Sequence, residues 1–246
     1  MPSKESNNKT KAPLTGIDEV RRALENPIDT PRLNRMAFGK TDVVIITGGI
    51  AENCPSHMIL PSVMDELCAA GVELECITVI YAHGGREPLS RDEMRAHVGD
   101  IVFSCIRCIN ADPGRTVNLG TTSHNTPVEI FGEAAYSDLR ICIGAVEQSD
   151  FAGYTGGYDA ILPGAASHEA IRINRALANG AESVAGIYEN PVREDINEME
   201  NFCRADFIIN VILNESGEIT RCTTGSPLTA HSAIVRRCEA RGYAAF

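Results

Sequence analysis

Short apolar segments that alternate with helix-like segments are the feature of this sequence that most constrains its fold. Residues 42–47 read DVVIIT, a continuous β-branched run typical of strands that are buried on both faces. Similar runs occur at residues 76–81, 139–146 and 207–213. Strands separated by helices join through right-handed crossovers and form parallel sheets. The sequence therefore predicts an α/β fold, Rossmann-like, with a mostly parallel sheet and helices on both faces.

Capping residues mark the helices between these strands. Ser90 opens a capping box, and Asn190 followed by Pro191 is a typical helix start. Thr126 before Pro127 repeats that pattern and predicts a third helix start. We therefore expect helices over residues 58–67 with a stop at Gly71, and over 90–98, 126–137, 167–178, 191–204 and 227–241, with further extended segments at 101–109 and 218–222.

Charge and hydropathy exclude two classes of partner. The chain has 246 residues, and its 22 Lys+Arg against 33 Asp+Glu give a net charge of −11. Basic residues cluster only within residues 4–11, so no nucleic acid partner is expected. No apolar run approaches the ~20 residues of a membrane helix, so no membrane partner is expected either. Residues 1–12 lack the apolar core of a secretory signal and are expected to form a disordered tail of a cytoplasmic protein.

The nine cysteines fit a reducing compartment. Their number is odd, and most of them lie within apolar runs. Cys105 and Cys108 form a C-x-x-C pair, but no second pair follows at zinc-finger spacing. In a strand the two side chains would point to opposite faces. We interpret them as core thiols, and we predict no metal site.

Ligands of parallel sheets bind beyond the carboxyl ends of the strands, which directs attention to four loops. In residues 48–57, Ser56 and His57 stand at a helix start whose N–H groups favour an anion, although Ser56 as a plain helix cap is the alternative. In residues 82–88, His83 or Arg86 is suited to bind a carboxylate. The alternative for Arg86 is a surface pair with Glu87.

The third loop, residues 119–126, is dense in hydroxyl groups. Thr121, Thr122 and Ser123 predict a cradle for a carboxylate or phosphate. His124 is an acid or base candidate there, although many such histidines only fill hydrogen bonds.

The fourth loop, residues 147–167, is the most distinctive segment. Its glycines permit close approach of a ligand, and Glu147, Asp150 and Asp159 are carboxylates for acid–base chemistry. A purely structural glycine-rich loop is the alternative, but the concentration of carboxylates favours function. The middle of this loop supplies the binding candidates Tyr154, Thr155, Gly156 and Gly157.

The sequences of these loops resemble the N-terminal domain of the nickel-dependent lactate racemase family. The matching pieces are DVVIITGGIAENCPSHMILP, NLGTTSHNTPVEI, VEQSDFAGYTGGYDAILPGAASHEAI and TGSPLTAH, in the same order from residue 42 onward. The resemblance implies that residues 13–246 form a single α/β domain of this type. Family members add a C-terminal α/β domain and place catalysis in the cleft between the two. We expect that second domain to be absent here.

The resemblance does not extend to the catalytic residues. Gly49 and Glu52 stand where the family motif has Asp and Arg. Arg86 and Ser149 stand where it has its two catalytic histidines. Altered chemistry at the substrate is therefore expected.

The cofactor positions also differ. Asp159 replaces the lysine that tethers the nickel-pincer nucleotide, and Arg175 replaces a histidine that binds the nickel. Neither side chain supplies an amine tether or an imidazole ligand. No covalent nickel-pincer nucleotide is expected, and any other cofactor is unknown.

Two hypotheses follow. The first is a lactate-racemase-like isomerase, a racemase or epimerase acting by proton abstraction on a small 2-hydroxy carboxylate. The second is a non-catalytic or partner-dependent subunit that binds a small carboxylate, either as a homo-oligomer or with a separate chain that supplies the missing domain. The catalytic candidates are Asp159, Arg86, His124, His83 and Glu147, and the substrate-binding candidates are Ser56, His57, Thr121, Thr122, Ser123, Tyr154, Thr155, Gly156, Gly157 and Arg175.

Overall fold

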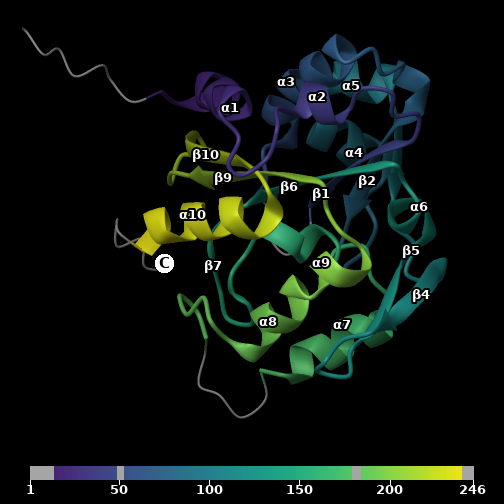
Figure 1. Ribbon diagram of the computed structural model, residues 1–246, viewed down its shortest axis with the longest axis vertical. Helices are drawn as coiled ribbons and strands as arrows, with labels where there is room; N and C mark the ends of the chain where they lie inside the picture. Colours follow the sequence, from purple (N-terminus) through teal and green to yellow (C-terminus); the bar gives the residue numbers. More distant parts are fainter. Residues whose placement is uncertain (1–13, 49–52, 179–183, 240–246) are drawn as a thin grey trace, which may run out of the picture.

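A six-stranded sheet forms the centre of the molecule (Figure 1). The computed structural model describes residues 14–48, 53–178 and 184–239. Five strands run parallel, and β10 pairs antiparallel with β9 at one edge. The strand order is β10-β9-β6-β1-β2-β3, with β1 at Val43–Gly48, β2 at Ile77–Ala82, β3 at Arg107–Asn110, β6 at Leu139–Ala145, β9 at Phe207–Leu213 and β10 at Ile219–Gly225. The predicted fold class is confirmed.

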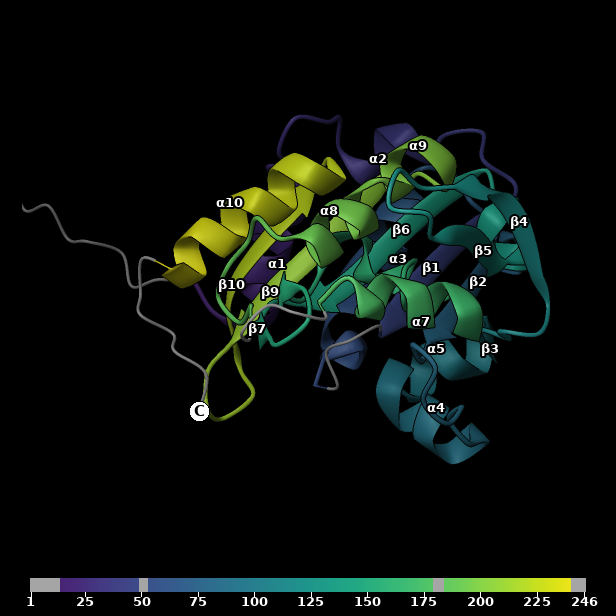
Figure 2. The same ribbon diagram turned by 90° about the horizontal axis from the view of Figure 1, so that it is seen from below.

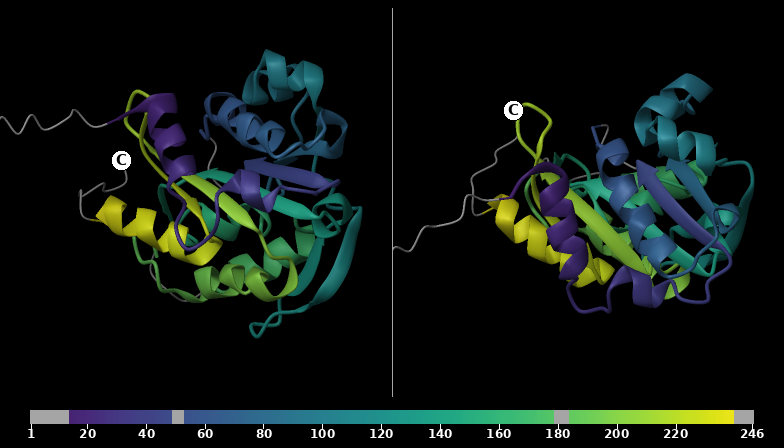
Figure 3. Two further views of the ribbon diagram at one scale, coloured as in Figure 1. Left: turned by 45° about the horizontal axis from the view of Figure 1, so that its top comes forward. Right: turned by 90° about the horizontal axis from the view of Figure 1, so that it is seen from above.

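The continuous apolar runs arise because both faces of the sheet are buried. Along β1, Val43 and Ile45 face one core cluster, and Val44 and Ile46 face the other. The sheet thus lies between two layers of helices, with the purple and blue helices on one side and the green and yellow helices on the other (Figures 2 and 3). The first layer contains α1 (Gly16–Glu25), α2 (Leu33–Met36), α3 (Ser56–Ala69), α4 (Arg91–Val98) and α5 (Asp100–Cys105); the second contains α7 (His168–Ala176), α8 (Pro191–Asn197), α9 (Met199–Phe202) and α10 (Pro227–Glu239).

The predicted helix over residues 126–137 is wrong. Residues 116–131 form a hairpin of β4 (Thr116–Thr121) and β5 (Pro127–Phe131), and only Gly132–Ala135 is helical, as α6. Val128 and Ile130 are buried while Pro127 and Glu129 are half-buried, which is the alternation of a strand. Pro127 is tolerated because it is the first residue of that strand.

The extended segment predicted at residues 101–109 is also wrong. The run divides into α5 and the short strand β3. Cys105 is therefore exposed at the end of a helix, and Cys108 lies half-buried in a strand. The core-thiol interpretation fails for Cys105. All nine cysteines have free thiols.

Of the other helix-cap predictions, two are confirmed and one is wrong. Ser90 forms its capping box with Glu93, and Asn190 accepts the Arg193 N–H as predicted. Ser56, in contrast, does not cap a helix, because Pro55 holds the N-cap position and Ser56 is already helical. The described residues contain no helix long and apolar enough to cross a membrane.

Candidate functional site

An open pocket of about 480 Å³ lies at the carboxyl ends of β2 and β3. The loop after β2 contributes His83, Arg86 and Glu87, and the segment after β3 contributes Asp112 and Arg115. This is the edge of the sheet where parallel α/β folds place their ligands. The rest of the lining comprises Gly85, Pro88, Arg107, Ile109, Asn110, Ala111, Pro113, Phe131, Glu133 and His168.

His83 combines burial with an uncommitted ring nitrogen. Its side chain is 4% exposed, and its Nε2 lies 2.8 Å from the carbonyl oxygen of Ala111. Because a carbonyl only accepts, Nε2 must carry the proton in this contact. Nδ1 then keeps a lone pair, and it has no hydrogen-bond partner within the described chain. His83 thus lines the pocket and carries a buried ring nitrogen whose lone pair is able to accept a proton.

Two arginines of this pocket are held by contacts within the fold. Arg107 forms a two-pronged ion pair with Glu133. Arg86, half-buried, donates from Nε to the carbonyl oxygen of His83 at 3.1 Å. This bond fixes the Arg86 side chain against the turn that also carries His83.

A second hollow of about 550 Å³ adjoins the first, because Gly85 and His168 line both. Its remaining lining is Phe151, Ile171, Arg172, Arg175 and Ala176. His168 was not among the predicted residues. The available signal was its place at the start of a helix directly after the glycine-rich loop, within the segment ILPGAASHEAI.

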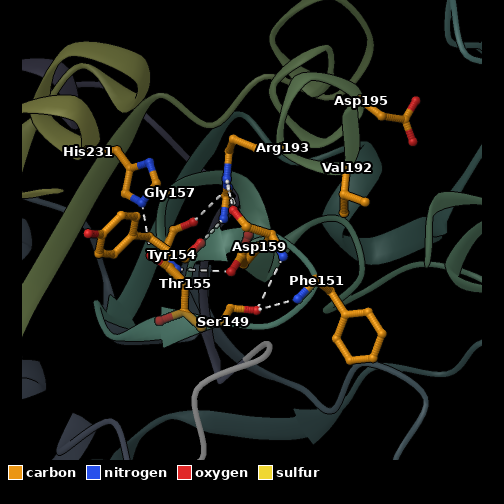
Figure 4. Close-up of polar contacts among 12 residues, drawn as sticks. Ser149, Phe151, Tyr154, Thr155, Gly157, Asp159, Val192, Arg193, Asp195 and His231 are labelled. Carbon is orange, nitrogen blue, oxygen red and sulfur yellow. Dashed lines mark hydrogen bonds and ion pairs between the residues drawn. The ribbon is translucent and has the colours of Figure 1, made fainter. Parts of the chain in front are cut away.

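The centre of the glycine-rich loop is buried. Asp159 is 2% exposed, and its Oδ1 lies 2.9 Å from Nη1 of Arg193, which is 1% exposed (Figure 4). Arg193 also donates to the carbonyl oxygens of Ala152, Tyr154 and Gly156. The ion pair therefore holds the loop in place.

Burial governs the ionisation of this cluster. It raises the pKa of Asp159 to about 6, against the opposing charge of Arg193. It also lowers the pKa of His231 to about 3, so His231 is neutral and its Nε2 donates to the carbonyl oxygen of Thr155 at 2.8 Å. Gly156 (φ +93°) leaves no room for a side chain, since an added Cβ would lie 2.8 Å from Val146. Tyr154, Thr155, Gly156, Gly157 and Asp159 line neither hollow.

The hydroxyl-rich segment packs against α8 and α9. Thr122 and Thr126 donate to the fully buried Asp195, which Figure 4 shows pointing away from Arg193. Ser123 donates to Glu198, which lies between α8 and α9, and His124 Nε2 lies 3.9 Å from Glu194 of α8. Thr121 is exposed, as is Glu147 at the start of the glycine-rich loop.

Ser56 belongs to a buried chain of hydrogen bonds at the end of β1. Its Oγ lies 2.5 Å from Oγ1 of Thr47, which lies 3.2 Å from Nε2 of His97. Burial, with a smaller contribution from the nearby His57, lowers the pKa of His97 to about 4. His57 itself is exposed.

The structure thus brings together only part of the predicted set. His83 and Arg86 share one hollow, and Arg175 lies in the adjoining one. The other candidates lie in the glycine-rich loop, the hairpin or the start of α3. Gly49 and Glu52 lie outside the described residues. Across the described part of the chain, no group of three or more His, Cys, Asp or Glu side chains has the geometry to hold a metal ion.

Comparison with known proteins adds an independent line of evidence. A family model described as the lactate racemase N-terminal domain matches residues 3–186. A lactate racemase from Thermoanaerobacterium thermosaccharolyticum is 30% identical over 235 residues, 93% of this chain and 54% of the relative. A lactate racemase from Lactiplantibacillus plantarum is 28% identical over 224 residues, 89% of this chain and 53% of the relative. The chain therefore spans about half the length of these relatives.

Comparison with solved structures supports the same fold. The lactate racemase apoprotein from Thermoanaerobacterium thermosaccharolyticum superimposes with a TM-score of 0.82 at 29% identity, over 92% of this chain and 55% of that one. A protein from Thermotoga maritima gives 0.74 at 16% identity, over 92% of this chain and 60% of that one, which supports the fold alone.

Proposed function

The chain belongs to the lactate racemase N-terminal domain family, and on that premise we propose that it is a lactate-racemase-like isomerase of a small 2-hydroxy carboxylate. The observation that carries the proposal is the pocket at the ends of β2 and β3, which gathers Arg86, His83 and His168. These residues supply a cation for the carboxylate and two imidazoles for proton transfer.

Arg86 binds the carboxylate of the substrate. A guanidinium group matches a carboxylate through two parallel N–H···O bonds, and it stays charged at any physiological pH. Because the chain carries a net charge of −11, an anionic ligand needs a local cation where it binds. Arg86 also stabilises the extra negative charge that develops on the carboxylate when the neighbouring carbon loses its proton.

His83 and His168 exchange the proton at that carbon. His83 takes the C2 proton on its free Nδ1, and the electron pair moves into the carboxylate. His168, protonated, returns a proton to the opposite face, which inverts the configuration and conserves all atoms. Asp159, His124 and Glu147 remain alternative acid–base residues of the proposal, and the remaining predicted binding residues stay candidates for substrate contact.

The residues present do not fit a covalently held nickel-pincer nucleotide. Asp159 stands at the tether position, where it is a buried carboxylate paired with Arg193. Arg175 stands at the metal-ligand position, and a guanidinium is not a metal ligand. We therefore propose chemistry without this cofactor. Intact-mass measurement of protein produced together with the cofactor-synthesis enzymes tests this, and an added mass with stoichiometric nickel would refute it.

Proton exchange at C2 tests the function directly. The protein is incubated in D₂O with each enantiomer of a panel of 2-hydroxy acids, and NMR follows deuterium incorporation together with inversion. We expect exchange with at least one acid, and a loss of about 10²–10⁴-fold in His83→Gln and in His168→Gln. Asp159→Asn serves as the comparison, because unchanged exchange in this variant removes Asp159 from the chemistry. Absence of exchange with every acid would refute catalysis by this chain alone.

The alternative is a partner-dependent subunit that binds the carboxylate but needs another chain to close the site. In this alternative the pocket at the ends of β2 and β3 holds the carboxylate, and the other chain supplies the groups for the chemistry. Gel filtration measures whether the purified chain self-associates, and co-expression with a separately encoded C-terminal domain measures whether exchange then begins. We place either form of the protein in the cytoplasm, where its nine free thiols stay reduced.

A further inference from the structure

The hollow beside α7 is lined by one face of that helix. His168, Ile171, Arg172, Arg175 and Ala176 stand at intervals of three and four residues, so their side chains share one side of α7. Gly85 and Phe151 complete the lining. Among the described residues that line this hollow there is no carboxylate, although the chain as a whole is strongly acidic.

The two arginines of this hollow are not equivalent. Arg172 forms a two-pronged ion pair with Glu169, at 2.8 and 2.7 Å. Arg175 makes no ion pair within the described residues. Its guanidinium lies 5.6 Å over the ring of Phe151 and donates to the carbonyl oxygen of Gly84 at 3.4 Å. The aromatic ring orients the charge without neutralising it.

Phe151 itself is unusual for a phenylalanine in a glycine-rich loop. It is 46% exposed, and Figure 4 shows its ring directed away from the buried cluster of Arg193 and Asp159. The ring therefore forms part of the surface of the hollow and is not part of the core. Together, Phe151 and Arg175 present a fixed, unneutralised cation beside the proposed substrate pocket.

The two hollows join at Gly85 and His168, directly beside Arg86. Their volumes of about 480 and 550 Å³ each lie within the range of roughly 300–1,000 Å³ that holds drug-sized ligands. A three-carbon hydroxy acid with one carboxylate would occupy one hollow in part and leave the other, with its cation, unused.

We propose that the hollow beside α7 is a second anion subsite, and that the ligand is a 2-hydroxy acid with a second anionic group. Arg86 binds the carboxylate next to the hydroxyl carbon, Arg175 binds the second anion, and His168, which lines both hollows, lies between them at C2. The second anion is a carboxylate or a phosphate, which share charge and oxygen acceptors. This inference rests on the proposed function and specifies its substrate class.

Matched pairs of acids test it by calorimetric titration of the full chain. Lactate and malate differ by a second carboxylate, and glycerate and 3-phosphoglycerate differ by a phosphate. We expect the dianion of at least one pair to bind about tenfold or more tightly than its monoanion. Arg175→Gln should weaken the dianion by about ten- to a hundredfold and the monoanion by less than about twofold.

Arg204→Gln is the control for charge. It removes one positive charge from the segment after α9, where Arg204 pairs with Glu200 outside both hollows, so no affinity should change. Circular dichroism verifies the fold of each variant.

Each outcome is decisive. Which pair shows the larger preference distinguishes a carboxylate from a phosphate as the second anion. Equal weakening of monoanion and dianion by Arg175→Gln, or no preference for either dianion, overturns the second subsite. If lactate then still binds and Arg86→Gln abolishes that binding, the proposed function stands without this inference. If none of the four acids binds, both fall.

Discussion

Arg193 should be among the side chains whose loss most destabilises the fold. It is the largest of the fully buried side chains, and it connects α8 to the glycine-rich loop through Asp159 and three carbonyl oxygens. Arg193→Met keeps most of the apolar volume and removes the charge and every donor. The variant therefore isolates the polar contribution.

The size of this loss of stability follows from the buried groups that Arg193→Met leaves without a partner. Breaking a buried ion pair by removing one partner costs about 3–5 kcal/mol. Asp159, whose pKa is already raised to about 6, would take up a proton at neutral pH, and this limits its share of the cost. The orphaned carbonyl oxygens of Ala152, Tyr154 and Gly156 account for much of the remainder. We expect a loss of about 3–5 kcal/mol, or a fall in Tm of about 6–20 °C for a domain of this size.

Urea unfolding followed by circular dichroism measures this loss at pH 7. Arg193→Lys is the matched comparison, because it keeps the charge beside Asp159 but lacks the fork that reaches the carbonyl oxygens. It should fall between the wild type and Arg193→Met. A loss below about 1 kcal/mol in Arg193→Met would refute the structural role assigned to this cluster.

Three further predictions concern other buried groups. Asp195→Ala leaves three buried donors without an acceptor and should lower the free energy of unfolding in urea by about 3 kcal/mol or more. The exposed Ser123→Ala should lower it by less than about 1 kcal/mol, and equal losses in the two variants would contradict the role of Asp195. Cys68 and Cys105, the exposed thiols, should react fastest with a thiol reagent in the native protein, with all nine reacting after unfolding; faster reaction of the buried thiols would contradict the fold. Burial raises the pKa of Asp159 from 3.8 to about 6, so the folded protein binds this proton more tightly than the unfolded chain does. The stability that this group contributes is therefore complete below about pH 4 and is lost as the pH rises to about 6. Asp159→Asn should flatten that part of the curve of stability against pH, and an unchanged curve would contradict the shift.

The strands were predictable because their signal is strong and local. A run such as residues 207–213 has the length and the β-branched content of a strand that is buried on both sides, and few other structures accept it. The hairpin at residues 116–131 was not predictable from the same reasoning. Thr126-Pro127 is a helix start by local chemistry, but pairing with β4 and burial of Val128 and Ile130 decide the structure.

The helix α1 had no prediction. Its buried apolar residues, Val20, Ala23 and Leu24, are only three, and its other residues are largely polar. Packing against α3 and β10 stabilises it, and those elements lie far away in the sequence.

Part of the candidate site was likewise predictable from the sequence, and part was not. Arg86 and His83 follow a clear strand, so their place at the ligand edge could be predicted from the fold rule alone. The burial of Asp159 could not, because its partner Arg193 comes from a helix more than thirty residues later and no sequence pattern links the two. His168 was overlooked because a single histidine at a helix start has no motif of its own.

Binding of a 2-hydroxy acid beside Arg86 is the central claim, and calorimetric titration of the wild type, Arg86→Ala and Arg86→Lys tests it most directly. The titration uses a panel of 2-hydroxy acids, with circular dichroism to verify the fold. Loss of a charge-assisted contact should weaken binding in Arg86→Ala by about ten- to a hundredfold, and Lys should restore only part because it lacks the planar fork. Unchanged affinity in Arg86→Ala would contradict the account and leave Arg86 as a surface residue with no part in the site.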